Sequence, residues 1–86
     1  MNVIIGIDVG GSTTKIVGYY EDGKLIGRLK VEAADPLTSA YGALGKFVNE
    51  NKLSLSQVKQ IVLTGVGAFL FKEEIYGIHI CSLSGI

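Results

Sequence analysis

The sequence predicts an α/β domain built on a mixed sheet, with elements in the order βββαβαβ. Three observations support this fold class: short β-branched runs separated by glycine turns, one segment with helical spacing, and a further apolar run after that segment. Strands joined by tight turns are antiparallel, whereas a strand reached through a helix returns parallel to the first strand. The predicted sheet therefore contains both kinds of pairing.

The first part of the chain contains three predicted strands. Val3–Asp8 is a short apolar run, Thr14–Tyr20 alternates in polarity, and Lys24–Ala33 follows the turn Glu21–Gly23. Asp-Gly between two apolar runs is a strong hairpin signal, because glycine adopts a positive φ at little cost. We therefore expect an antiparallel meander of three strands.

An amphipathic helix is predicted after the meander, beginning at Asp35-Pro36 and ending near Asn51. Asp is a favoured N-cap, and Pro fits the first helical position because its missing N–H is not needed there. Ser54–Gln57 resembles a capping box and predicts one short turn. The remaining predicted elements are a buried strand at Gln60–Thr64, a helix at Ala68–Tyr76 and a strand at Ile78–Ser82.

The length of 86 residues predicts a single domain, spanning residues 1–86. Hydrophobic residues make up 48% of the chain and charged residues 19%, a balance typical of globular domains. The mean hydropathy of +0.41 is high for so short a chain and indicates apolar surface beyond one small core. We therefore expect a second domain or subunit to cover it, and predict a homo-oligomer such as a dimer.

Charge and cysteine content exclude several classes of function. Eight basic and eight acidic residues cancel, so nothing indicates binding to nucleic acid or to an anionic membrane. Cys81 is the single cysteine, which excludes an intrachain disulfide or a cysteine-held cluster within one chain. We identify no catalytic side chain, and the lone His79 fits a structural role. The absence of a secretory leader pattern predicts a cytoplasmic protein.

The segment Asp8-Val-Gly-Gly-Ser-Thr-Thr-Lys15 links the first two predicted strands and concentrates polar groups. It fits neither the Walker pattern nor the dinucleotide-binding GxGxxG pattern. Glycines let backbone N–H groups approach a phosphate, hydroxyls add donors, and lysine adds a positive charge. The predicted phosphate-binding residues are Gly10, Gly11, Ser12, Thr13 and Lys15, with Thr14 as a further hydroxyl.

Asp8 would repel a phosphate, so its predicted role is to hold Mg²⁺ or the waters of Mg²⁺. A carboxylate, backbone amides, hydroxyls and a lysine together suit a magnesium nucleotide better than a bare anion. The alternative is a polar hairpin whose glycines serve only the turn.

A second glycine turn, Thr64-Gly-Val-Gly-Ala68, follows a buried strand and precedes a predicted helix. Alone it is a weak signal, since such turns commonly serve only the chain reversal. Both glycine loops leave the carboxyl ends of core strands, however, and in α/β sheets these ends line the ligand crevice. We therefore expect the two loops to face one site.

These motifs resemble the actin/hexokinase/Hsp70 ATPase superfamily and, within it, type II pantothenate kinases. The resemblance implies the N-terminal ribonuclease-H-like lobe of an ATP-dependent kinase that phosphorylates pantothenate in the first step of coenzyme A biosynthesis. ATP phosphates would lie around Gly10, Gly11, Ser12, Thr13 and Lys15, with Mg²⁺ near Asp8. Thr64, Gly65, Gly67 and Ala68 would line the crevice on the phosphate and pantothenate side.

Two departures from that family affect the expected activity. Val66 replaces a glycine of the second motif, and no carboxylate follows Glu74, although family members carry an Asp-Glu pair in this region. The resemblance covers only the front portion of such a kinase. We therefore expect the 86-residue chain to lack kinase activity by itself, and phosphorylation of pantothenate by the purified chain would refute this.

Other functions fit the same motifs. One alternative is a sugar or N-acetylglucosamine kinase lobe. Another is the ATPase activator of a 2-hydroxyacyl-CoA dehydratase, which shares the first signature but holds an iron–sulfur cluster with cysteines, and the single Cys81 argues against it. A non-enzyme alternative is an actin-like module that oligomerises through its apolar face.

Overall fold

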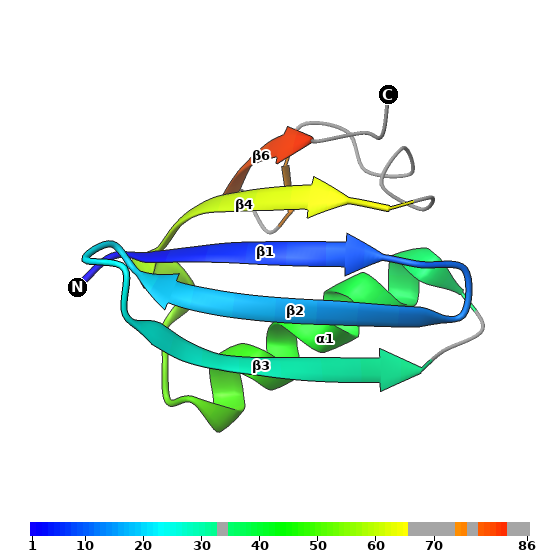
Figure 1. Cartoon of the computed structure of the whole chain (residues 1–86), viewed down its shortest axis with the longest axis horizontal. Coiled ribbons are helices and arrows are strands. Elements are labelled where there is room, and N and C mark those ends of the chain that lie inside the picture. Colours follow the sequence, from blue (N-terminus) through cyan, green and yellow to red (C-terminus); the bar gives the residue numbers. More distant parts are fainter. Residues whose placement is uncertain (33–34, 66–73, 76–77, 83–86) are drawn as a thin grey trace.

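The computed structural model describes residues 1–32, 35–65, 74–75 and 78–82. Its first three strands, β1 (Val3–Val9), β2 (Thr13–Tyr20) and β3 (Leu25–Glu32), form the predicted antiparallel meander (Figure 1). At the turn between β2 and β3, Gly23 has a φ of 94°, and its N–H donates to the Tyr20 carbonyl at 2.8 Å. The hairpin prediction from Asp-Gly is therefore confirmed.

Helix α1 (Pro36–Glu50) begins where the sequence predicts it. The carboxylate of Asp35 accepts hydrogen bonds from the Thr38 amide at 2.8 Å and from the Thr38 hydroxyl at 2.6 Å. These hydrogen bonds favour the charged carboxylate and lower the pKa of Asp35 below its ordinary value. The N-cap is thus an ionised carboxylate at neutral pH.

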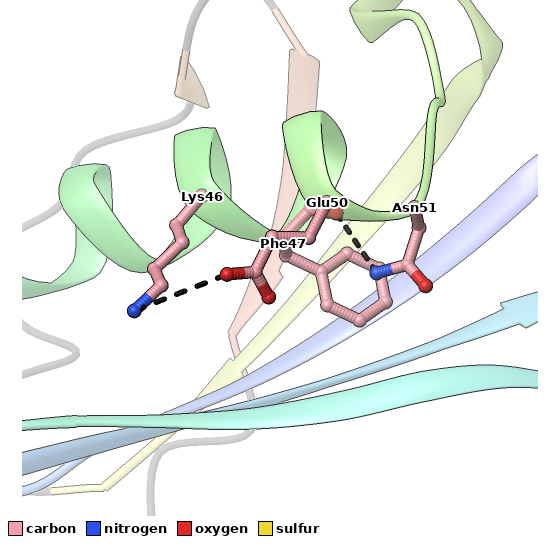
Figure 2. Close-up of polar contacts among 4 residues, drawn as sticks. All are labelled: Lys46, Phe47, Glu50 and Asn51. Carbon is pink, nitrogen blue, oxygen red and sulfur yellow. Dashed lines mark hydrogen bonds and ion pairs between the residues drawn. The ribbon is translucent and has the colours of Figure 1, made fainter.

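Two side-chain interactions stabilise the last turn of α1 (Figure 2). The side-chain amide of Asn51 donates to the Phe47 carbonyl at 2.9 Å, and Lys46 Nζ lies 4.0 Å from Glu50 Oε2. A short 3₁₀ helix, η1 (Leu55–Gln57), then begins at Ser54 with the predicted capping box. The side chains of Ser54 and Gln57 bond each other's backbone amides there, as a capping box requires.

The second half of the sheet is built around β4 (Val58–Thr64), which pairs parallel to β1. Strand β6 (Ile78–Ser82) pairs parallel to β4, and the two-residue strand β5 (Glu74–Ile75) pairs antiparallel to β6. The strand order is β3-β2-β1-β4-β6-β5. The predicted mixed sheet is therefore confirmed.

The predicted helix at Ala68–Tyr76 is wrong where the structure describes it. Glu74 and Ile75 form β5 instead, and residues 68–73 and 76 lie outside the described part of the chain. Ile75 is fully buried and pairs with Ile78, so two β-branched side chains meet across adjacent strands. This pairing places Ile75 in the core, which the helical interpretation of the segment did not anticipate.

The two faces of the sheet differ. Helix α1 lies behind the strands in Figure 1 and packs on β1, β2 and β3, and no described helix lies on the near face. Contact with α1 is close at Gly18, where a Cβ would lie 2.6 Å from ring atoms of Phe47.

At 15 residues, α1 is too short to cross a bilayer, and no other described helix is longer. The buried core comprises Val3, Ile5, Ile7, Val9, Ile16, Ala40, Ala43, Leu44, Phe47, Val58, Ile61, Leu63, Ile75, Ile78 and Ile80.

Candidate functional site

The loop between β1 and β2 is a tight turn that Gly10 makes possible. The Gly10 N–H donates to the Thr13 carbonyl at 2.8 Å, and a Cβ at Gly10 would lie 2.7 Å from that oxygen. The Gly10 amide is therefore used within the turn rather than directed at a ligand. Gly11 and Ser12 are exposed at the tip, where a Cβ on Gly11 would meet no atom within 4 Å. Among the loop residues, these two present the most accessible donors.

Thr14 does not belong to the exposed loop, contrary to its predicted role as a hydroxyl donor to phosphate. Its side chain is fully buried on the α1 face, and its hydroxyl oxygen accepts a hydrogen bond from the Ser39 hydroxyl at 2.8 Å. The alternation along β2 explains this position, since Thr14 shares its face with Ile16 whereas Lys15 points the other way. Thr14 and Ser39 therefore tie β2 to α1, a role that the sequence interpretation missed.

Four polar side chains line up across four strands on the face opposite α1. Lys15 is the register partner of both Asp8 on β1 and Lys30 on β3, and Asp8 is also the partner of Thr64 on β4. Neighbouring strands lie about 4.8 Å apart, so these side chains are close neighbours. We call Lys30, Lys15, Asp8 and Thr64 the polar row.

The second glycine turn packs directly against the polar row. Gly65 has a φ of 100°, and a Cβ there would lie 2.5 Å from the Val9 carbonyl oxygen and 2.6 Å from Asp8 Oδ1. Only glycine fits both the backbone conformation and the contact. The structure thus brings Thr64 and Gly65 beside Asp8, as the sequence predicts, whereas Gly67 and Ala68 lie outside the described residues.

The charged groups of the polar row are available to a ligand. Asp8 and Lys15 are exposed, and within the described part of the chain neither side chain has a hydrogen-bond or ion-pair partner. A nearby cation and carboxylate that do not satisfy each other can bind a phosphate and a metal ion side by side.

The donor set fits Mg²⁺ bound together with a phosphate. Mg²⁺ is commonly held by one or two carboxylates, with waters and phosphate oxygens completing the octahedron. Asp8 provides one carboxylate, Thr64 provides a hydroxyl beside it, and Gly65 keeps a side chain away from the carboxylate. No group of three metal-ligating side chains occurs among the described residues, so that part of the chain holds no all-protein metal cage.

A hollow of about 540 Å³ lies on the same face as the polar row. Gly6, Val17 and Val62 form its floor, because the missing side chain of Gly6 leaves a depression between two valines. The polar row borders the hollow at one end and Tyr19 borders it at the other. The face therefore combines a charged end with an apolar centre.

Comparisons with known proteins identify the fold. No protein-family model matches the sequence, and neither does any curated protein. Solved structures do match. One is the activator of 2-hydroxyisocaproyl-CoA dehydratase from Clostridium difficile with bound ADPNP, at a TM-score of 0.78 and 18% identity over 95% of this chain and 29% of the activator. Another is component A of (R)-2-hydroxyglutaryl-CoA dehydratase from Acidaminococcus fermentans, at a TM-score of 0.79 and 13% identity over 98% and 31% of the two chains.

A protein from Chromobacterium violaceum assigned as an N-acetylglucosamine kinase is also similar, with a TM-score of 0.71 and 20% identity over 98% of this chain and 35% of that protein. The predicted ribonuclease-H-like, actin-like fold is thereby confirmed. The chain spans about a third of the length of these proteins. None of the three is a pantothenate kinase.

Proposed function

We propose that this chain is the lobe of an actin-like ATPase that holds the phosphates of a magnesium-bound nucleoside triphosphate. The observation that carries the proposal is the meeting of Asp8, Lys15 and Gly65 at the carboxyl ends of β1 and β4. Ligands of open α/β sheets bind outside the carboxyl ends of the strands. The bound ADPNP of the similar dehydratase activator supports a nucleotide as the ligand.

Each residue of the proposed site has a distinct task. The Lys15 ammonium neutralises phosphate charge, while the Gly11 amide and the Ser12 hydroxyl at the loop tip donate hydrogen bonds to phosphate oxygens. The Asp8 carboxylate binds Mg²⁺ or one of its waters. Phosphoryl transfer depends mainly on positioning and charge stabilisation, which are the contributions that these groups make.

For the whole protein, the comparisons favour the activator alternative over the pantothenate kinase. One of the similar structures is a dehydratase activator, another is component A of a 2-hydroxyglutaryl-CoA dehydratase, and a third is assigned as an N-acetylglucosamine kinase. Support for pantothenate rests on the sequence resemblance alone. We therefore propose an activator-type ATPase lobe, whose iron–sulfur cluster would need cysteine ligands besides Cys81, with an N-acetylglucosamine kinase lobe as the second candidate.

Affinity measurements on matched variants test the nucleotide site. The 86-residue chain is titrated with ADPNP, with and without Mg²⁺, by isothermal calorimetry or by competition against a fluorescent nucleotide. We expect Lys15→Ala to weaken binding about tenfold, in line with the loss of a charge-assisted hydrogen bond of roughly 1.5 kcal/mol. Asp8→Asn should remove the gain in affinity that Mg²⁺ provides.

Lys24→Ala is the matched control, because Lys24 lies at the opposite end of the β2–β3 hairpin and is also exposed. It should leave the affinity unchanged. Equal losses for Lys15→Ala and Lys24→Ala would mean that the chain binds nucleotide only through its overall charge. Binding that persists unchanged in Lys15→Ala and Asp8→Asn would favour the interpretation of the loop as a simple hairpin.

A further inference from the structure

Lys30 belongs to the polar row but has no task in the proposed nucleotide site. Strands β1, β3 and β4 run in the same direction, so their carboxyl ends share one edge of the sheet (Figure 1). Asp8, Lys30 and Thr64 each lie within two residues of the end of one of these strands. Lys30 is therefore at the edge where open α/β sheets bind their ligands.

Lys30 and Lys15 are like charges that face each other across neighbouring strands. Like charges at directly opposed positions of a sheet destabilise it. Both side chains are exposed, and neither forms an ion pair with a described residue. The nearby carboxylates do not separate the two lysines, because Asp8 lies on the far side of Lys15 and Glu32 faces Thr13 in the register. An anion bound to both lysines would relieve the repulsion.

A simpler role for Lys30 would be protection of the sheet edge. Strand β3 is the outermost strand at one end of the strand order, and lysines on edge strands discourage pairing with other chains. Arg28 meets that need as well, since it is exposed and lies two residues earlier on the same face of β3. The register partner of Arg28 is Val17, whereas that of Lys30 is Lys15. Edge protection therefore explains a cation on β3, but it does not explain a cation opposite Lys15.

The polar row is long enough for more than one phosphate. Asp8, Lys15 and Lys30 lie on three neighbouring strands, so the row extends about 10 Å from Asp8 to Lys30. Mg²⁺ at Asp8 would hold the phosphates at that end, and the flexible stems of the two lysines let their ammonium groups reach phosphates further along. A chain of three phosphates extends further along the row than a chain of two, and it carries more negative charge.

We propose that Lys30 is a specificity-determining residue, which binds the phosphate chain beside Lys15 and makes the site prefer a triphosphate to a diphosphate. The inference rests on the proposed function, in which Asp8 binds Mg²⁺ and Lys15 binds phosphate. Mg²⁺ and Lys15 hold the phosphates that both ligands have, and Lys30 adds a contact that only the longer chain reaches. Removing Lys30 should therefore change the choice between ligands, whereas removing Lys15 should weaken the binding of both.

Calorimetric titrations of the 86-residue chain in the presence of Mg²⁺ test this role. ADPNP and ADP are the nucleotide probes, and tripolyphosphate and pyrophosphate repeat the comparison without a nucleoside. Lys30→Ala should weaken ADPNP binding about fivefold, the size expected for one exposed ionic contact, and ADP binding by less than about twofold. The inorganic pair should show the same difference, because the contact is to the phosphate chain. Lys30→Arg keeps the charge and should keep the preference of the parent chain.

Arg28→Ala is the matched control, because it removes a positive charge from the same strand and face but outside the polar row. It should leave the ratio of ADPNP affinity to ADP affinity unchanged. Urea denaturation gives a second readout: Lys30→Ala should not lower the free energy of unfolding, since it removes a repulsion with Lys15. A loss of ADPNP affinity without a loss of stability separates a ligand contact from a structural role.

The inference is overturned if Lys30→Ala leaves the ratio of ADPNP to ADP affinity unchanged, or if Arg28→Ala lowers that ratio equally. Lys15→Ala in the same titrations separates this failure from a failure of the proposed function. If Lys15→Ala weakens binding and Lys30→Ala does not alter the ratio, the nucleotide site stands and Lys30 only protects the edge of the sheet. If neither variant weakens binding, the chain does not hold nucleotide through the polar row.

Discussion

The two faces of this sheet are made by the same strands and have opposite properties. On the α1 face, Ile7, Val9 and Ile16 are almost completely buried, and the two buried polar side chains that the structure describes are hydrogen-bonded to each other. On the face opposite α1, which we call the open face, Asp8 and Lys15 are exposed and lack side-chain partners among the described residues. One face therefore provides stability, and the other presents unsatisfied charge to a ligand.

The largest expected difference between the faces is in core packing. Phe47→Ala should lower the free energy of unfolding by about 3–5 kcal/mol, because Phe47 is 1% exposed and fills the space that Gly18 leaves. That is a large share of the roughly 5–15 kcal/mol typical of small domains. Val17→Ala, on the open face, should cost less than about 1.5 kcal/mol. Urea denaturation followed by circular dichroism measures both, and similar losses would contradict the division between the faces.

Gly65 should be the most sensitive position at the boundary between stability and binding. Gly65→Ala should cost about 1–3 kcal/mol, because the added Cβ meets the Val9 carbonyl and φ is positive. The displaced turn should also weaken ADPNP binding. Gly42→Ala is the control: it lies on an exposed helical position with open space around it, and should stabilise the chain by about 0.5–1 kcal/mol. A neutral Gly65→Ala would show that the turn does not pack on β1 as described.

A smaller effect is expected at the buried hydroxyl pair. Thr14→Val should cost about 1–2 kcal/mol, because it leaves the Ser39 hydroxyl without its acceptor. Adding Ser39→Ala should recover much of that loss, since both polar groups are then removed. Neither change should alter ADPNP affinity, because the pair lies on the α1 face. Weaker nucleotide binding in Thr14→Val, with normal stability, would show that the Thr14 hydroxyl contributes to phosphate binding.

The smallest expected effect is the pH dependence of the helix cap. The pKa of Asp35 is lowered by hydrogen bonds from Thr38, so its stabilising effect is complete above the ordinary value of 3.8 and is lost as the pH falls through the lower folded value. Comparing chemical unfolding of the parent and Asp35→Asn between pH 2 and pH 6 tests this. The difference in stability between them should shrink as the solution becomes acidic. A constant difference would contradict the role of the ionised cap.

Much of the fold could be predicted because local signals and the tertiary structure agree. The Asp35 cap, the Asp-Gly turn and the Ser54 capping box each depend on residues close together in sequence, and all three are confirmed. The helix predicted over Glu74 and Ile75 was wrong there because a short apolar segment suits either structure. Its pairing with β6 decides the matter, and β6 is itself fixed by a non-local contact, the parallel pairing of Ile80 with Ile61 on β4.

The candidate site was predicted in its composition but not in its arrangement. Sequence reasoning treated the hydroxyls of the first loop as equivalent, whereas the strand register turns Thr14 to the core and Lys15 to the open face. It also could not show that the Gly10 amide closes the turn, or that Lys30 joins the polar row. These features depend on the exact geometry of the turn and on the register between paired strands, which the residue pattern of one segment does not specify.

In the proposed function, a magnesium nucleotide binds the polar row, and the α1 face only supports the strands that carry the row. Mapping the amide chemical shifts of the ¹⁵N-labelled chain during titration with Mg-ADPNP separates the two faces. We expect the largest changes at Gly11, Ser12, Lys15 and Thr64, and smaller changes when Mg²⁺ is omitted. Changes concentrated on α1, or no saturable change at the polar row, would show that the nucleotide does not bind the polar row.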